Sequence, residues 1–186
     1  MSSETDAARA ALRQRQGKGA RFDANSAPHD DLLLARRGTA FFARNLLDLS
    51  DTDLYQPSAV EGRSRAWVVA DVSFAARRQA LMLESLFRGG PADLPSEFEH
   101  QFSDLDLAET LPPQAIRHLF RHSEVHLNVC WRDLSDAQWD LELALSNGSV
   151  ASPRFLPRLR AVQVWQAALG LANGASARDF PVELKD

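Results

Sequence analysis

Three histidines follow one another at four-residue intervals, at positions 118, 122 and 126. An α-helix turns about 100° per residue, so steps of four drift by only about 40° and leave His118, His122 and His126 on one side of a helix. Imidazole nitrogens bind zinc and also exchange protons near neutral pH. The spacing is therefore compatible with a metal site, for which Asp71 is the carboxylate that we nominate from outside the row, or with a hydrogen-bonding role.

Other reactive side chains are isolated. Cys130 is the single cysteine and occupies an apolar position of its predicted helix, which favours a buried, inert thiol over a nucleophile. Four arginines stand in two adjacent pairs, and guanidinium groups match carboxylates in a two-pronged way. These pairs could clamp a dicarboxylate or lie solvated on helix faces: Arg36, Arg37, Arg77 and Arg78.

Apolar residues recurring at three to four positions predict the helices that would hold these side chains. The first helix is expected over about 31–49 with a cap at Asp30 or Asp31, and the second from about 65 to a stop at Gly89. A shorter helix is expected over about 97–109 after a capping box at Ser96 and Glu99. Two more are expected over about 113–132 and from Pro157 to Asn173. Between the last two, alternating leucines before Asn147 and Gly148 predict a short hairpin or extended arm. The fold class is all-α, a mostly antiparallel four-helix bundle over residues 30–183 with a flexible arm over 1–29.

Composition excludes several classes. The 186 residues suit one domain, and 25 acidic against 21 basic residues leave a net charge of −4 without a basic run, which disfavours nucleic-acid binding. Apolar runs are far shorter than the roughly 20 residues that cross a bilayer, and the first 11 residues do not resemble a secretory signal. A single cysteine excludes a disulfide framework within the chain. We expect a cytoplasmic protein without a membrane partner.

Several strings resemble the maleylpyruvate isomerase branch of the DinB-like, mycothiol-dependent metalloenzyme family. They cover about residues 20–181 in a fixed order: APHDDLLLARRGTAFFA (27–43), LSDTDL (49–54), HSEVHLNVCWRDLSDAQWD (122–140), VW (164–165), NGAS (173–176) and DFP (179–181). The resemblance implies a DinB-like four-helix bundle and cis–trans isomerisation of maleylpyruvate, a step of aromatic compound degradation. It also implies one divalent metal, usually zinc, and a low-molecular-weight thiol.

The departures from the family concentrate where the resemblance places the metal ligands, a His on the second long helix and a Glu and a His on the last. Here these positions hold Asp71, Gln163 and Ala167. The family arginine before that Glu is Val162, and Trp67 replaces a nearby His. A carboxylate, an amide and a methyl group are a poor donor set for zinc. We therefore expect no metal or other cofactor at these positions.

These features predict a divergent maleylpyruvate isomerase-like protein that has lost the usual metal site. If activity is retained, Asp71 and Gln163 are expected to line the pocket, with His122 and His126 as proton carriers. The expected partner is a small carboxylic acid, and a homodimer stays open. The alternative is a non-catalytic helical bundle that binds a small molecule or a sister subunit.

Overall fold

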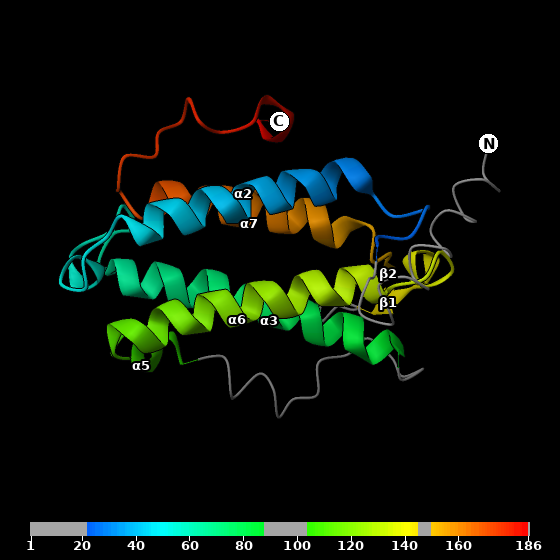
Figure 1. The fold of residues 1–186 in the computed structure, drawn as a ribbon, viewed down its shortest axis with the longest axis horizontal. Helices are drawn as coiled ribbons and strands as arrows, with labels where there is room; N and C mark the ends of the chain where they lie inside the picture. The colour runs from blue at the N-terminus through cyan, green and yellow to red at the C-terminus, as the bar shows by residue number, and fades with distance from the viewer. Residues whose placement is uncertain (1–21, 88–103, 145–149, 186) are drawn as a thin grey trace, which may run out of the picture.

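The computed structural model describes residues 22–87, 104–144 and 150–185. Four long helices lie side by side (Figure 1): α2 (His29–Leu47), α3 (Arg65–Phe87), α6 (Pro113–Asp133) and α7 (Phe155–Gly170). A short helix, α5 (Leu105–Ala108), precedes α6, and 3-10 turns cover Asp53–Tyr55, Gln138–Asp140 and Val182–Leu184. The all-α bundle that the sequence predicts is confirmed.

The helix boundaries differ slightly from the predicted ones. Helix α2 begins two residues earlier than predicted, after Pro28, and has no side-chain cap. Asp30 and Asp31 instead lie in its first turn, where the helix dipole stabilises negative charge. Helix α7 begins at Phe155, so Pro157 falls within the first turn, which does not need its missing N–H. The predicted capping box at Ser96 and Glu99 lies outside the described residues.

The predicted hairpin is present before α7. Strands β1 (Leu143–Ala144) and β2 (Val150–Ala151) pair antiparallel, with Leu143 opposite Ala151. The turn at Asn147 and Gly148 lies outside the described residues. The hairpin is two residues long on each side, so the bundle supplies almost all of the fold.

The helix directions correct the expectation of a mostly antiparallel bundle. The most extensive contacts are between α2 and α7 and between α3 and α6, and the helices in each pair run parallel (Figure 1). Ser64 at the start of α3 hydrogen-bonds Glu109 just before α6, while Glu84 near the end of α3 contacts His126 in α6. Two consecutive helices can run parallel only when a long segment connects them, and 25 residues, 88–112, separate α3 from α6 in the sequence.

Glycine brings α2 and α7 close together. A Cβ at Gly38 would lie 2.6 Å from Val164 and from the indole Nε1 of Trp165. That indole donates a hydrogen bond of 3.2 Å to the backbone oxygen of Leu34, and its ring stacks on Phe41 with centroids 4.9 Å apart. The α2–α7 pair therefore depends on a small residue at position 38.

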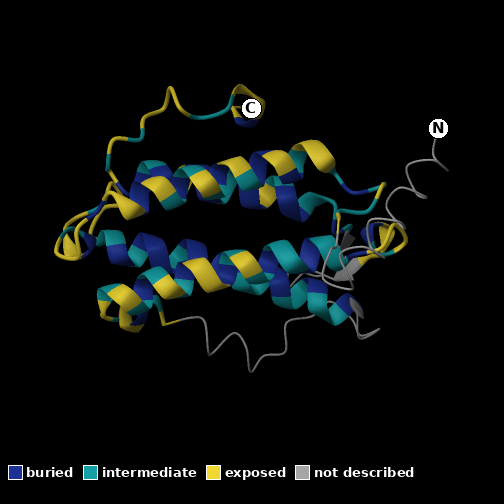
Figure 2. Ribbon diagram, viewed as in Figure 1, coloured by how far each residue is buried: buried dark blue, intermediate teal, exposed yellow. Residues whose placement is uncertain are grey.

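Buried residues lie mainly on the sides of the helices that face one another, and exposed residues lie mainly on the outside of the bundle (Figure 2). The core is built from aliphatic and aromatic residues of all four long helices, with Phe42, Ile116, Leu127 and Leu83 fully covered. No helix among the described residues combines the length and apolar character needed to cross a lipid bilayer.

Part of the segment that the sequence assigns to an N-terminal arm lies against the bundle. Residues 1–21 are outside the described residues, but Asp23 binds Arg36 through two hydrogen bonds of 2.6 and 2.7 Å. The backbone N–H of Ser26 donates to Asp136 at 2.7 Å. Burial raises the pKa of Asp23, but the hydrogen bonds and charge of Arg36 outweigh it and hold the pKa below its ordinary value.

Candidate functional site

Asp71 and Gln163, the two polar residues expected to line the pocket, are on adjacent helices, α3 and α7. Asp71 is half-buried, and burial raises the pKa of its carboxyl above the ordinary value, although the charges of Arg78 and Arg160 oppose that rise. Two guanidinium groups therefore act on the one carboxylate of the site. Their positive charge disfavours a cation beside Asp71.

The amide of Gln163 is already engaged. Its side-chain oxygen accepts a hydrogen bond of 3.1 Å from the side-chain nitrogen of Gln79, which is almost completely buried on α3. Ala167, one turn further along α7, presents only a methyl group. The sequence did not single out Gln79, because an isolated glutamine in a helix carries no pattern.

Arg160 on α7 lies in the interior of the bundle and is completely buried. It donates a hydrogen bond of 2.7 Å to the backbone oxygen of Val72 in α3 and forms an ion pair with Glu124 on α6. Among the described residues, its Nε has no hydrogen-bond partner. One side chain thus joins three helices in the region where the resemblance places the family's metal.

These residues do not fit a divalent metal at the family position. A zinc ion there needs several nitrogen, sulfur or carboxylate donors, whereas Asp71 is the only carboxylate, Gln163 is bonded to Gln79 and Ala167 has no donor atom. The positive charge of Arg78 adds to the mismatch, whereas Glu124 balances the charge of Arg160.

The three histidines do share one side of α6, as their spacing predicts. The ring centroids of His118 and His122 are 6.0 Å apart, and those of His122 and His126 are 6.2 Å apart. His118 and His122 are exposed, whereas His126 is half-buried. The structure does not bring Asp71 to this row as a ligand; the carboxylate beside it is Glu84.

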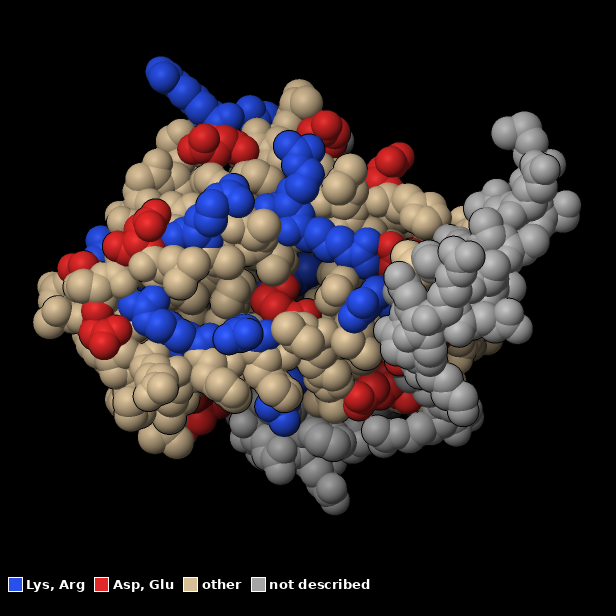
Figure 3. Space-filling model, viewed as in Figure 1, with Lys and Arg blue, Asp and Glu red and all other residues tan. Residues whose placement is uncertain are grey.

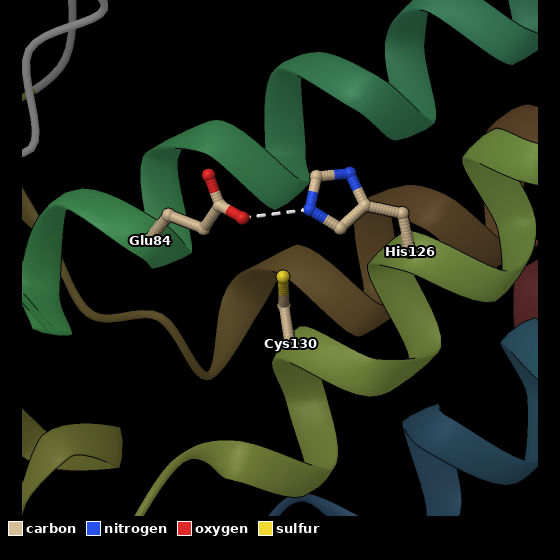
Figure 4. Close-up of side chains that lie close together, drawn as sticks. All are labelled: Glu84, His126 and Cys130. Atoms are coloured by element: carbon tan, nitrogen blue, oxygen red, sulfur yellow. Dashed lines mark hydrogen bonds and ion pairs between the residues drawn. The ribbon is translucent and has the colours of Figure 1, made fainter.

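Figure 4 shows the surroundings of His126. Its Nε2 is 2.7 Å from the Oε1 of Glu84 on α3, and the sulfur of Cys130 lies below this contact. One candidate ligand atom from each of the three residues lies within 4.8 Å of the other two. Glu84 was missed at the sequence level, because its proximity to His126 depends on the parallel packing of α3 and α6.

Cys130 is buried, as predicted, with 3% of its surface exposed. Burial raises the pKa of its thiol to about 12, and the negative charges of Glu84 and Asp133 add to the rise. The isolated protein therefore keeps this sulfur as a neutral thiol at physiological pH.

Of the arginines that could clamp a dicarboxylate, Arg36 is already used. It holds Asp23 in a two-pronged ion pair and donates to the side chain of Asn128 at 2.9 Å. Arg37 is exposed, and Arg77 and Arg78 are half-buried. The electrostatic influence of Arg78 on Asp71 makes it the arginine of this set that belongs to the candidate site.

A groove of about 610 Å³ lies elsewhere, between α2 and α6. Figure 3 looks onto this face and shows acidic side chains near its centre with basic side chains on both sides. Glu124 lines it, together with Thr39, His118 and Arg121. Glu124 therefore both lines the groove and pairs with the buried Arg160.

The comparisons with known proteins agree with this fold. The model of the mycothiol maleylpyruvate isomerase N-terminal domain family matches residues 35–167, more than half of the chain. The chain therefore belongs to this family, and the resemblance inferred from its motifs is confirmed. No sequence among the curated proteins matches it.

Two solved structures are similar over most of the chain. They are crystal structures of the mycothiol-dependent maleylpyruvate isomerase and of a variant in which a histidine is replaced by alanine. Each is 26% identical, superposes with a TM-score of 0.76 and matches 84% of this chain. The chain spans 65% of the length of these proteins, slightly less than two thirds.

Proposed function

We propose that this chain is a divergent maleylpyruvate isomerase-like protein that binds a small keto dicarboxylic acid of the kind formed by aromatic ring cleavage. We further propose that it holds no metal at the family's position. Family membership and the similarity to mycothiol-dependent maleylpyruvate isomerase support the substrate class. The corresponding reaction is a thiol-assisted cis–trans isomerisation in the cytoplasm.

The observation that carries the proposal is the charge around Asp71. The arginines Arg78 and Arg160 act on its carboxyl, and the remaining positions offer an engaged amide and a methyl group. A guanidinium group suits a substrate carboxylate through charge-assisted hydrogen bonds, and Arg78 is the more accessible of the two. Because Glu124 already balances Arg160, Arg78 is the guanidinium group that we propose binds the acid.

In this proposal Asp71 and Gln163 line the site, and His122 or His126 moves protons. His126 contacts Glu84, which lies about 20 Å along α3 from Asp71 at 1.5 Å per residue, so His122 is the better placed of the two. Half-buried Asp71 has a raised pKa, which brings a carboxyl group closer to the range useful for acid–base work. The contact with Glu84 orients the ring of His126, while His122 is exposed and can exchange protons with water.

A non-catalytic role is the second candidate. The Arg160–Glu124 ion pair and the Gln79–Gln163 hydrogen bond favour it, because in both contacts the polar groups already bind one another and not a substrate. In this case the protein binds the acid, or a partner subunit, without converting it.

The test combines ligand binding, turnover and metal analysis. Maleylpyruvate is added to the purified protein with and without mycothiol, and tryptophan fluorescence and substrate absorbance are recorded. We expect Arg78→Ala to weaken binding by about tenfold or more, the scale of one charge-assisted hydrogen bond, and exposed Arg37→Ala to leave it unchanged. Binding with turnover supports the isomerase, and binding without turnover supports the non-catalytic role.

Metal content tests the other half of the proposal. Stoichiometric zinc that disappears in Asp71→Ala would contradict it. Conversely, the combined substitutions Asp71→His, Gln163→Glu and Ala167→His restore the donor types that the resemblance implies, and we expect them to create a zinc site at this position. Equal zinc content in the triple variant and the parent chain would count against the assignment of these positions.

A further inference from the structure

We propose that Glu84, His126 and Cys130 form a divalent-metal site, best suited to zinc, at a position different from that of the family's metal. The three candidate ligand atoms come from two adjacent parallel helices and lie within 4.8 Å of one another. Carboxylate oxygen, imidazole nitrogen and thiolate sulfur are the three ligand types that zinc uses in proteins.

The helix spacing explains why the site can form. His126 and Cys130 are four residues apart on α6 and therefore project from the same face, and Glu84 reaches them from α3 (Figure 4). A tetrahedral ion with bonds of about 2.0–2.3 Å holds its ligand atoms about 3.3–3.6 Å apart. The 2.7 Å contact between Glu84 and His126 would have to open by roughly 0.6 Å, within reach of a side-chain adjustment.

A Cys–His–Glu catalytic triad is the competing interpretation, and the geometry disfavours it. In a triad the two ring nitrogens face different partners, the nucleophile on one side and the carboxylate on the other. In Figure 4 the Nε2 of His126 faces Glu84 and is the ring nitrogen nearer Cys130, while Nδ1 points away from the sulfur. The three groups converge on one point, as ligands around an ion do.

Burial and charge agree with the metal site. The sulfur is buried, whereas 27% of the His126 side chain and 29% of the Glu84 side chain remain exposed. An ion can therefore reach the site from solvent. Binding replaces the thiol proton of Cys130 with the metal and releases that proton, and it requires Nε2 of His126 to be unprotonated. Three protein ligands leave a fourth position for water.

The experiment uses Co²⁺ as a spectroscopic probe and Zn²⁺ as its competitor. The chain is stripped with a chelator, titrated with Co²⁺, and examined for one equivalent of bound ion and for a thiolate-to-cobalt charge-transfer band that Zn²⁺ removes. We expect Cys130→Ser to abolish the band, and His126→Ala and Glu84→Gln to weaken binding by at least about tenfold. His122→Ala is the matched control and should bind normally, because His122 is exposed one turn away on the same helix.

The absence of bound Co²⁺, or binding without the thiolate band, overturns the inference even if a variant fails to fold, because both are read from the unchanged chain. Binding that survives Cys130→Ser but is lost in His122→Ala would assign the metal to the histidine row instead. Metal lost only in Asp71→Ala overturns both this inference and the proposed function, whereas a metal-free chain overturns this inference alone. Circular dichroism of each variant verifies the helical fold.

Discussion

The guanidinium group of Arg160 and the carboxylate of Glu124 form an ion pair inside the bundle, between α7 and α6. Arg160 is completely buried, while 13% of the Glu124 side chain remains exposed in the groove between α2 and α6. The hydrogen bond of Arg160 to Val72 extends the connection to α3. Burying an unpaired charge costs several kcal/mol. Removing Glu124 leaves a fully buried charge and removing Arg160 leaves a partly exposed one, so the two substitutions should differ in their effect on the free energy of unfolding.

We expect Glu124→Gln to lower the free energy of unfolding by about 3–5 kcal/mol, because it leaves the Arg160 charge buried without its counterion. Arg160→Met should cost less, since the charge left behind on Glu124 can still reach water. Urea unfolding followed by circular dichroism measures both. Exposed Glu142→Gln is the control and should stay within about 0.5 kcal/mol. Equal costs for Glu124→Gln and Glu142→Gln would contradict the role of the pair.

The bundle could be predicted because its information is local. The spacing of Ile116, Phe120 and Leu127 marks one buried face of α6, and these residues are indeed buried. Helix direction is not local: α3 and α6 have the same direction because of the long connection over residues 88–112, and apolar periodicity is the same for either direction. The expectation of a mostly antiparallel bundle missed the two parallel pairs for this reason.

The same distinction applies to the sites. The i, i+4 relation of His126 and Cys130 follows from helix geometry and is visible in the sequence. Their proximity to Glu84 depends on how α3 packs against α6. In the same way, the contact between Gln79 and Gln163 depends on how α3 packs against α7. Interhelical polar contacts of this kind involve single residues, which leave no periodic signal.

The raised pKa of Asp71 has a consequence for pH-dependent stability. Its folded-state pKa is above the ordinary value of 3.8, so the folded protein binds more protons than the unfolded chain, and this carboxyl costs stability as the pH rises from about 3.8 through the folded pKa. We therefore expect Asp71→Asn to be more stable than the parent chain at pH 7 and to approach it near pH 3.

Thermal unfolding from pH 3 to pH 7 measures this difference. Glu61→Gln, at an exposed carboxylate, is the control and should change the unfolding free energy by no more than about 0.5 kcal/mol. A lower stability of Asp71→Asn at pH 7 would mean that the negative charge is stabilised by Arg78 and Arg160 more than burial penalises it.

Cys130 should react very slowly with alkylating agents in the metal-free protein. With the pKa of its thiol at about 12 against an ordinary 9.0, the thiolate fraction at pH 8 is about a thousandfold lower than in the unfolded chain. Iodoacetamide labelling followed by mass spectrometry should therefore show alkylation of Cys130 at least about a thousandfold slower in native protein than in guanidinium chloride. Comparable rates in the two conditions would show that the sulfur is accessible and ionised, contrary to its burial.

Gly38 is the position where the α2–α7 contact tolerates least change. An alanine there would place its Cβ 2.6 Å from Val164 and 2.6–2.7 Å from the Trp165 ring, inside contact distance. Overpacking of this kind costs about 1–3 kcal/mol, whereas replacing a helical glycine with alanine by itself gains about 1 kcal/mol. Because Trp165 is held by its bond to Leu34 and its stacking on Phe41, it has little room to move, and we expect the clash to prevail.

Urea unfolding of Gly38→Ala should therefore show a net loss of stability, accompanied by a change in tryptophan fluorescence from Trp165. Ala40→Gly, at an exposed position of the same helix, isolates the backbone effect and should cost about 0.5–1 kcal/mol without a fluorescence change. If Gly38→Ala is instead more stable than the parent chain, α2 and α7 can separate at little cost, and the close approach at Gly38 is not what holds the pair together.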